Sequence, residues 1–208
     1  MKKIEHTPFI WQYLDITSNE EIETIRNACL EHVHNNDEFV ERNRSDAVRN
    51  SSYNLTDAFS PIQSNLLLRQ KMYDVDQSLS KIYQEAQDLY IKENKLFMYT
   101  LEAANVTGLG TSYHFRNYDV GDEYDYHVDL WEKGRFILSG ILYLNDDFEG
   151  GDTHYLVDDI HVKPIKNSIV MCPCGPYFIH SSVPVKKGTK NIIWSCFDRL
   201  VKGSPLLQ

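Results

Sequence analysis

Three potential metal ligands that lie far apart in this sequence constrain what the chain can fold into. His127 and Asp129 are two residues apart, so on an extended strand their side chains point to the same face and can reach one metal ion. His180 follows 53 residues after His127 and must come from another strand. Two histidines and one carboxylate on one side of an octahedral metal leave its other side open, which is typical of non-haem Fe(II) sites that bind a co-substrate and O₂. We therefore expect an iron site formed by His127, Asp129 and His180.

Lys190 indicates what the co-substrate is. It lies in a strand expected at residues 189–197, on the face that also carries apolar side chains. A lysine buried among apolar neighbours is costly unless it meets an anion. We expect residues 183–188 to form the turn of a hairpin that places Lys190 beside the strand of His180, at residues 177–181. A dicarboxylate that chelates iron at one end and reaches Lys190 at the other, such as 2-oxoglutarate, would satisfy both demands.

The N-terminal half shows helical periodicity with two start signals. Thr17-Ser18 precedes the acidic turn Asn19-Glu20-Glu21, and Ser60-Pro61 with Gln63 combines a cap, a first-turn proline and a capping box. We expect each helix to pack one apolar face against a sheet. The apolar positions are Ile22, Ile25, Cys29 and Val33 in the first helix, and Ile62, Leu66, Val75, Leu79, Ile82, Ala86 and Leu89 in one long or two shorter helices after it.

From about Leu96 onward we expect short strands separated by glycine and Asn/Asp turns. The predicted strands and turns are a strand at 136–144, a turn at Gly150-Gly151, and strands at 160–165 and 168–171. Many short strands at this spacing favour an antiparallel sandwich or jelly roll. The polar stretch 36–57 has no clear period, so we interpret it as an exposed loop, with a mobile flap over the active site as the alternative.

Several segments, taken in order, resemble one enzyme family. They are Tyr118-Asp-Val-Gly-Asp-Glu-Tyr124-Asp-Tyr-His127-Val-Asp129, Gly140-Ile-Leu-Tyr143-Leu-Asn145, Gly150-Gly151-Asp-Thr153, and Val183-Pro-Val185 with Gly188-Thr-Lys190 after His180. Over roughly residues 110–198 this pattern resembles the Fe(II)/2-oxoglutarate-dependent dioxygenases, in their prolyl 4-hydroxylase-like branch. The resemblance is weaker in the N-terminal half.

The resemblance implies a mainly β, α+β fold: a double-stranded β-helix of the jelly-roll or cupin kind with N-terminal helices packed on one sheet. It implies a single domain over residues 1–208, with a helical part at 1–95 and the β-helix core at 96–200. His127, Asp129 and His180 would hold Fe(II), and Lys190 would bind the distal carboxylate of 2-oxoglutarate. The further cofactor-site candidates, taken by position in the family, are Tyr143, Tyr118, Thr153 and Trp194, with Tyr124 a second aromatic position near the cavity.

The implied reaction is hydroxylation of an unactivated C–H bond with O₂ and 2-oxoglutarate, releasing succinate and CO₂, with ascorbate as a candidate reductant. A prolyl residue of a peptide or protein is the expected substrate; another side chain, a free amino acid or a small metabolite is the alternative. Two other classes remain open: a cupin-like metalloenzyme that does not use 2-oxoglutarate, and a non-catalytic binding module. The first gives no reason for Lys190, and the second gives no reason for an intact ligand set.

Composition limits the partners and the cellular location that we expect for this protein. A net charge of −9 argues against a nucleic-acid partner, which selects basic surfaces. No apolar run approaches the roughly 20 residues needed to cross a bilayer, and the N-terminus turns polar before an apolar signal region could form. We therefore expect a cytoplasmic protein without membrane contact, whose four cysteines are reduced. The sequence carries no signal for the oligomeric state.

Overall fold

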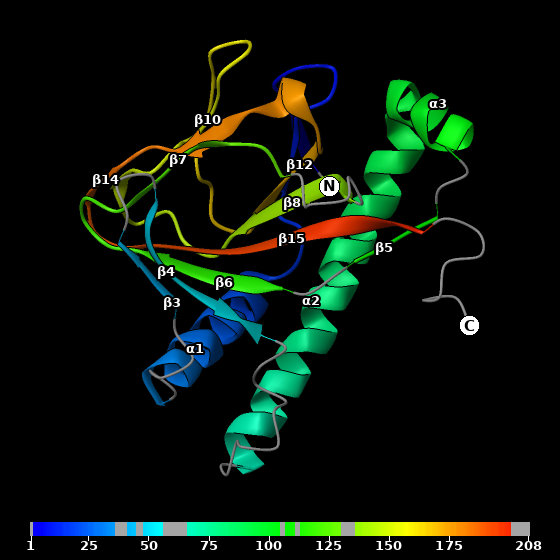
Figure 1. Ribbon diagram of the computed structural model, residues 1–208. Helices are drawn as coiled ribbons and strands as arrows, with labels where there is room; N and C mark the ends of the chain where they lie inside the picture. Colours follow the sequence, from blue (N-terminus) through cyan, green and yellow to red (C-terminus); the bar gives the residue numbers. More distant parts are fainter. Residues whose placement is uncertain are drawn as a thin grey trace.

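The protein folds as a large, curled antiparallel sheet with helices packed on one side (Figure 1). The computed structural model describes residues 2–35, 41–44, 48–55, 66–104, 107–110, 113–129 and 136–200. The helices are α1 (Asn19–Asn35), α2 (Leu66–Glu93), α3 (Lys95–Ala104) and the 3₁₀ turn η3 (Pro176–Phe178). The strands are β1 (Lys2–Glu5), β2 (Trp11–Leu14), β3 (Glu41–Arg44), β4 (Val48–Asn54), β5 (Thr107–Gly110), β6 (His114–Tyr118), β7 (Glu123–His127), β8 (Phe136–Tyr143), β9 (Glu149–Gly150), β10 (Thr153–Tyr155), β11 (Ile160–Val162), β12 (Ser168–Pro173), β13 (His180–Ser182), β14 (Val185–Lys187) and β15 (Lys190–Leu200).

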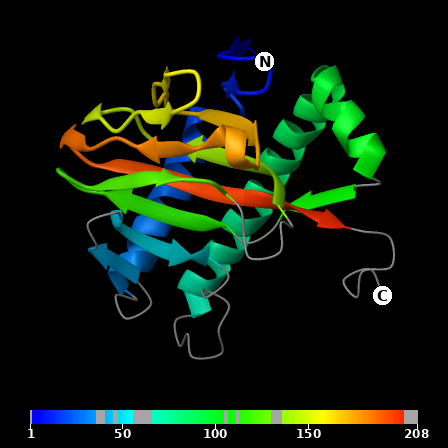
Figure 2. The ribbon, with the colours of Figure 1, turned by 45° about the horizontal axis from the view of Figure 1, so that its top comes forward.

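The sheet rolls up because one strand pairs on both sides of a bend. The hydrogen-bonded order is β1-β2-β12-β8-β15-β6-β4-β7-β13-β10-β11. Residues 51–54 of β4 pair with β6, whereas Val48 and Arg49 pair with β7, so β4 carries the sheet from one wall of the roll to the other. Figure 2 shows β15 running across the middle of this sheet. The expected double-stranded β-helix fold is confirmed.

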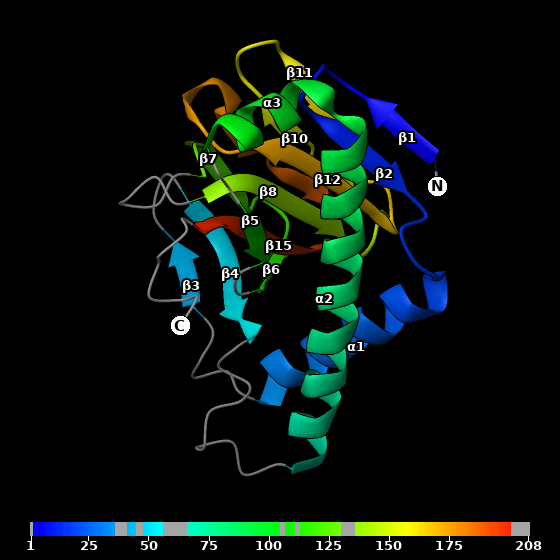
Figure 3. The same ribbon diagram turned by 90° about the vertical axis from the view of Figure 1, so that its right-hand side faces the viewer.

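Two apolar cores result from this arrangement. The larger lies between the helices and the outer face of the wall formed by β12, β8, β15 and β6; it includes Leu79, Tyr83 and Ile193. The smaller lies inside the roll and includes Tyr143 and Ile192. Neighbouring residues of β15 therefore serve different cores, as strand alternation requires. Figure 3 shows α2 lying across the sheet with α1 beside it. Within the described residues, no helix is long and apolar enough to span a membrane.

The first predicted helix start is confirmed, and the second lies outside the described residues. The Ser18 hydroxyl accepts a hydrogen bond from the Glu21 amide at 3.1 Å, as a helix cap does. Residues 60–63, with the expected capping box, are not described; the described helix begins at Leu66. Its apolar face is as expected from Val75 to Ala86, but Leu66 is 76% exposed, because the buried row begins instead at Leu68 and Met72.

The helical part does not end at residue 95 as expected. Asn94 ends α2 and caps α3, since its side-chain oxygen accepts the Phe97 amide hydrogen at 3.0 Å. The apolar run after Lys95 was interpreted as strand but forms α3, because a short apolar run has no periodicity that separates helix from strand. Conversely, β1, β2 and β4 from the N-terminal half join the same sheet as the later strands.

The interpretation of residues 36–57 as a loop or flap was wrong for the residues that are described. β3 and β4 pair with each other from Glu41–Ser52 to Arg44–Arg49, and β4 also bonds to β6 and β7. Asn50 and Tyr53 are buried. The segment lacks an apolar alternation because its order comes from main-chain pairing with distant strands, which local sequence does not reveal.

The predicted hairpin between the His180 and Lys190 strands was also wrong. β13 pairs with β7 and β10, whereas β15 pairs with β5, β6 and β8. The two strands therefore lie in opposite walls of the roll, and Lys190 reaches the β13 wall by the length of its side chain. The expected strand at 177–181 begins only at His180, because residues 176–178 form η3.

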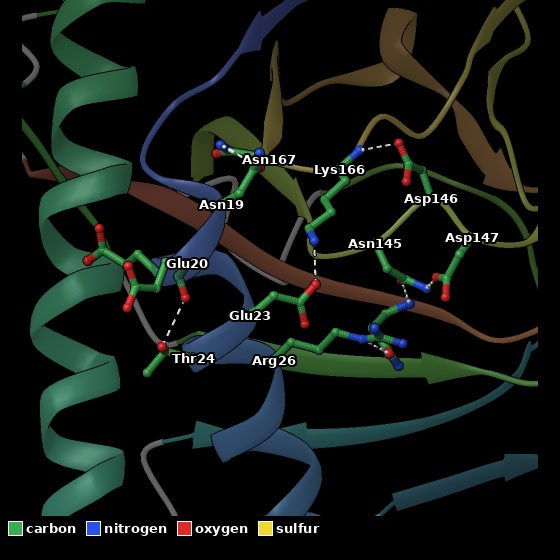
Figure 4. A network of polar contacts seen from close by, with 12 residues as sticks. Asn19, Glu20, Glu23, Thr24, Arg26, Asn145, Asp146, Asp147, Lys166 and Asn167 are labelled. Atoms are coloured by element: carbon green, nitrogen blue, oxygen red, sulfur yellow. Dashed lines mark hydrogen bonds and ion pairs between the residues drawn. The ribbon is translucent and has the colours of Figure 1, made fainter.

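A polar network around Asn145 fixes the start of β15 (Figure 4). The Asn145 side chain accepts the Asn191 amide hydrogen at 2.8 Å and donates to the Thr189 carbonyl at 2.7 Å. It therefore holds the residues on both sides of Lys190. Helix α1 supports the same segment, because Arg26 donates to the Asn191 side-chain oxygen at 2.8 Å. The Asn145 turn thus helps position Lys190.

We expect the packing of α2 to distinguish two leucines of the same helix. Leu79 is fully buried in the larger core, so Leu79→Ala should lower the free energy of unfolding by about 2–5 kcal/mol. Leu66→Ala should change it by less than about 0.5 kcal/mol, because Leu66 is exposed. Urea unfolding followed by circular dichroism measures both. Equal losses for the two variants would contradict this packing.

Candidate active site

The three predicted metal ligands meet at one end of the roll. His127 ends β7, His180 begins β13 directly opposite it, and Asp129 follows β7 by two residues. One ligand atom from each lies within 4.8 Å of the other two. The Nε2 atoms of His127 and His180 each lie 3.7 Å from a different oxygen of the Asp129 carboxylate. The predicted grouping of these side chains is therefore present.

Main-chain hydrogen bonds set the tautomer of both histidines. His127 Nδ1 lies 2.8 Å from the Asp125 carbonyl oxygen, and His180 Nδ1 lies 3.0 Å from that of Phe178. A carbonyl only accepts, so each Nδ1 carries the hydrogen and each Nε2 presents its lone pair toward Asp129. Metal-binding histidines are commonly oriented by such an outer bond. The separation of 3.7 Å from the carboxylate leaves room for a cation between the three side chains.

Electrostatics keep the set in its ligating form. Burial and the neighbouring His180 lower the pKa of His127 to about 4, so its imidazole is neutral near pH 7. Although burial opposes ionisation of Asp129, the facing His180 and His127 lower the pKa of its carboxyl below the usual value. A neutral His127 imidazole and an ionised Asp129 carboxylate therefore face each other near pH 7.

Lys190 lies in the same cavity, deeper in the roll. Its side chain is only 1% exposed, and its ammonium donates to the Gly151 carbonyl at 2.6 Å and to the Ser182 hydroxyl at 2.8 Å. Positive φ at Gly151 and a Cβ-sized space already in contact with the lysine stem explain why glycine stands there. Burial lowers the pKa of Lys190 to about 7; the charge of Asp152 opposes this change, and the charge of Arg116 adds to it.

Sequence comparison assigns this region to a family. Residues 113–197 match the model of the 2OG-Fe(II) oxygenase superfamily. This part of the chain belongs to the 2OG-Fe(II) oxygenase superfamily. The match runs from just before β6 to near the end of β15 and so contains all three metal-ligand candidates and Lys190. The enzyme is accordingly a 2-oxoglutarate-dependent dioxygenase that uses Fe(II) and O₂.

Solved structures show the same fold. The chain is similar to a viral collagen prolyl hydroxylase of Paramecium bursaria Chlorella virus-1 in complex with 2OG, with a TM-score of 0.62, 14% identity, and coverage of 92% of this chain and 97% of that one. For a Pseudomonas putida prolyl-4-hydroxylase the TM-score is 0.62 and the identity 16%, with coverage of 92% of this chain and 93% of that one. For a Trichoplax adhaerens prolyl hydroxylase in complex with a hypoxia inducible factor peptide fragment the TM-score is 0.66 and the identity 10%, with coverage of 97% of this chain and 88% of that one. A search of curated protein sequences found no match.

Three of the remaining predicted pocket residues, Tyr143, Tyr118 and Thr153, lie near Lys190. Tyr143 is fully buried, and its hydroxyl lies 2.6 Å from the hydroxyl of Thr153. The rings of Tyr118 and Tyr143 lie 5.0 and 5.8 Å from the Lys190 ammonium, within range of a cation–π attraction. Two hydroxyls and one ammonium thus converge in one pocket of this oxygenase, which suits a carboxylate.

Trp194 and Tyr124 lie on the metal side of the cavity. The Trp194 indole N–H donates to Asp129 at 3.3 Å, so Trp194 supports the carboxylate candidate ligand and does not contact the Lys190 pocket through its polar atom. The Tyr124 ring packs edge-on to His127 at 4.0 Å between centroids. These two aromatic side chains help define the position of the ligands in the oxygenase.

Sequence reasoning missed two features. Arg116 on β6 lines the cavity, and only its alternation with Tyr118 could have indicated that it faces inward. A second group that could hold a metal, His154, Asp159 and His161, lies on β10, β11 and the turn between them. The rings of His154 and His161 stack at 4.1 Å, and His154 Nε2 lies 2.9 Å from Asp159. Pairing of β10 with β11 brings these histidines together, and their spacing in the sequence gives no sign of it.

Proposed function

We propose that this dioxygenase hydroxylates an unactivated C–H bond of a prolyl ring, with His127, Asp129 and His180 as the ligands of Fe(II). The observation that carries the proposal is the joint placement, in one cavity, of an oriented ligand triad and a buried lysine that forms no ion pair with any described residue. The folds of the prolyl hydroxylases support the prolyl assignment. A relative that was solved with a peptide fragment supports a peptide as the carrier of that ring.

The residues of the chain bind and orient the reactants. Bound Fe(II) with 2-oxoglutarate supplies the activation of O₂ that C–H hydroxylation requires. His127 and His180 would each offer Nε2, while their main-chain hydrogen bonds hold the rings in place. Lys190, with the hydroxyls of Tyr143 and Thr153 nearby, would bind the distal carboxylate of 2-oxoglutarate. We retain Tyr118 as a further candidate contact of the co-substrate.

Burial of Lys190 distinguishes this proposal from its rivals. A metalloenzyme that does not bind 2-oxoglutarate, or a non-catalytic module, leaves the desolvated ammonium without a function or an anion. Ile192, which lines the cavity, belongs to the smaller apolar core together with the buried Tyr155 and Val170. These features favour a binding pocket for an anionic co-substrate.

The test is succinate release coupled to oxygen transfer. Purified protein with Fe(II), 2-oxoglutarate and ascorbate is offered proline-containing peptides, and succinate and peptide mass are followed together. We expect succinate release to rise with peptide, and the peptide to gain one oxygen atom on a prolyl ring. Matched peptides with alanine in place of proline are the control. Equal stimulation by the alanine peptides would reject the prolyl ring as the target.

We expect binding of 2-oxoglutarate to be linked to protonation of Lys190. In the empty pocket the pKa of Lys190 is about 7, so at pH 8 the amine is mostly neutral; a bound carboxylate favours the charged form and raises that pKa. Binding at pH 8 should therefore take up close to one proton and binding at pH 6 almost none. The affinity should fall as the pH rises above 7.

Calorimetric titration of Mn(II)-loaded protein in buffers of different ionisation enthalpy measures this uptake. Lys190→Met is the control, because it lacks the titrating amine. Whatever 2-oxoglutarate this variant still binds should be bound without pH-dependent proton uptake. The same proton count at pH 6 and pH 8 in the wild type would show that Lys190 is already charged in the empty pocket.

A further inference from the structure

Arg116 is a cation in the active-site cavity that the proposed function does not use. It lies on β6, one alternation away from Tyr118, and lines the cavity together with His127, His180 and Lys190. Its side chain is partly buried. Among the described residues it forms no ion pair with a carboxylate, whereas Arg49, on the neighbouring strand, is paired with Glu123. A partly buried guanidinium without a counter-ion calls for an anion.

Aromatic side chains hold the guanidinium on the metal side of the cavity. Its central carbon lies 4.7 Å from the centre of the Trp194 ring and 5.1 Å from that of Tyr124. Trp194 also donates to Asp129, and Tyr124 packs on His127, so both of these rings contact candidate metal ligands. Arg116 is therefore held on the metal side of the cavity by ring contacts, which leave the in-plane N–H donors that are not bonded to Tyr118 available for a planar anion.

Arg116 and Lys190 lie at different positions along the strands of the roll. Lys190 pairs with Tyr118 in the β15–β6 register, while Arg116 pairs with Ile192, one inward-facing position nearer to Trp194. Two residues along a strand span roughly 7 Å. Tyr118 stands between the cations, with its ring 5.0 Å from the Lys190 ammonium and its hydroxyl bonded to Arg116. A carboxylate bound at Lys190 therefore does not also pair with Arg116.

Two carboxylates act on the two cations without bonding to them directly. Asp152 acts through space on Lys190, and Asp129 acts through space on Arg116, but neither forms an ion pair with its cation among the described residues. No described carboxylate therefore offers the Arg116 guanidinium a direct partner.

We propose that Arg116 binds a carboxylate of the substrate, so that the molecule hydroxylated is a carboxylic acid: a free amino acid or the C-terminal residue of a peptide. This inference rests on the proposed function and specifies its substrate class. An internal residue of a long peptide would bring no carboxylate to Arg116.

Binding of acids and their amides to the wild-type protein tests this without any mutation. The protein is loaded with Mn(II) and 2-oxoglutarate, and paramagnetic relaxation of ligand protons reports binding near the metal. The probes are L-proline, N-acetyl-L-proline and glycyl-L-proline, each with its carboxamide, and the other common L-amino acids with theirs. We expect at least one acid to bind, on the order of 30-fold more tightly than its amide. The acids with a free or a blocked amine distinguish a free amino acid from a C-terminal residue.

The Arg116→Gln variant then assigns the effect to this side chain. It should lose the preference for acid over amide while its affinity for 2-oxoglutarate stays within about threefold of wild type. Arg69→Gln, on an exposed face of α2, is the matched control. Arg116→Lys keeps the charge without the two-pronged geometry and should recover part of the preference. Thermal unfolding verifies that each variant is folded.

Three results would overturn the inference while leaving the proposed function in place: amides that bind as well as acids, no acid that binds although 2-oxoglutarate does, or an Arg116→Gln variant with an unchanged preference for acids. A loss of 2-oxoglutarate affinity as large as that of a Lys190 variant would instead make Arg116 a co-substrate residue and would also overturn it. Failure of the wild type to bind 2-oxoglutarate would reject the proposed function itself.

Discussion

Replacing His180 by alanine is expected to abolish Fe(II) binding and turnover together. The change removes one of three ligand candidates from a buried position, and no other described side chain is placed to replace its Nε2 opposite Asp129. Loss of an outer partner of a metal site alone costs about 10–100-fold in affinity, so loss of a ligand should cost more than about 100-fold. Equilibrium dialysis against Fe(II) or Mn(II) under anaerobic conditions measures the affinity.

A second variant separates this effect from binding at the outer histidine group. His161→Ala removes one member of the His154, Asp159 and His161 group and should leave metal binding at the active site unchanged. The weak visible absorption of the Fe(II)–2-oxoglutarate chelate should persist in His161→Ala and vanish in His180→Ala. Thermal unfolding in the presence of a chelator establishes that both variants fold. Retained iron and absorption in His180→Ala would refute the assignment of the triad.

Replacing Lys190 by methionine is expected to lower the affinity for 2-oxoglutarate on the order of 100-fold. Removing one partner of a buried charge pair costs about 2–5 kcal/mol, and about 1.4 kcal/mol corresponds to a factor of ten. Methionine retains the apolar stem that packs beside Gly151 and Tyr118, so the pocket should keep its shape. Metal binding should be unchanged, because Lys190 lies deeper in the roll than the triad.

The matched control is Lys187→Met on β14. Lys187 is exposed and forms an ion pair with Glu149 at 3.1 Å, so its loss should not change the affinity for 2-oxoglutarate. Anaerobic titration of the metal-loaded proteins with 2-oxoglutarate compares the two variants. A Lys190→Met protein that binds 2-oxoglutarate within about threefold of wild type would show that the distal carboxylate is held elsewhere.

Short-range alternation explains why the individual site residues could be recognised. His127 and Asp129 are two residues apart at a strand end, and Lys190 lies on the inward face of β15 together with Ile192, so a period of two was enough to orient them. The caps of α1 were readable for the same reason, since Ser18 and Glu21 interact within one turn. All of these are relations between residues a few positions apart.

Pairing between distant strands was not readable in the same way. The sequence made β13 and β15 look like a hairpin, whereas they belong to opposite walls; it made β4 look like a loop, although β4 joins those walls. A strand records in its own residues which face is buried, but not which neighbour completes its hydrogen bonds.

The sequence by itself therefore determined the candidate ligand residues, the inward lysine and the helical faces, because each follows from the period of one element. Only the tertiary structure decided that Lys190 reaches Ser182 across the roll and that Arg116 shares the cavity with the triad. The same holds for the stacking of His154 on His161. Each of these depends on the curl of the sheet, a property of many strands together that no single segment encodes.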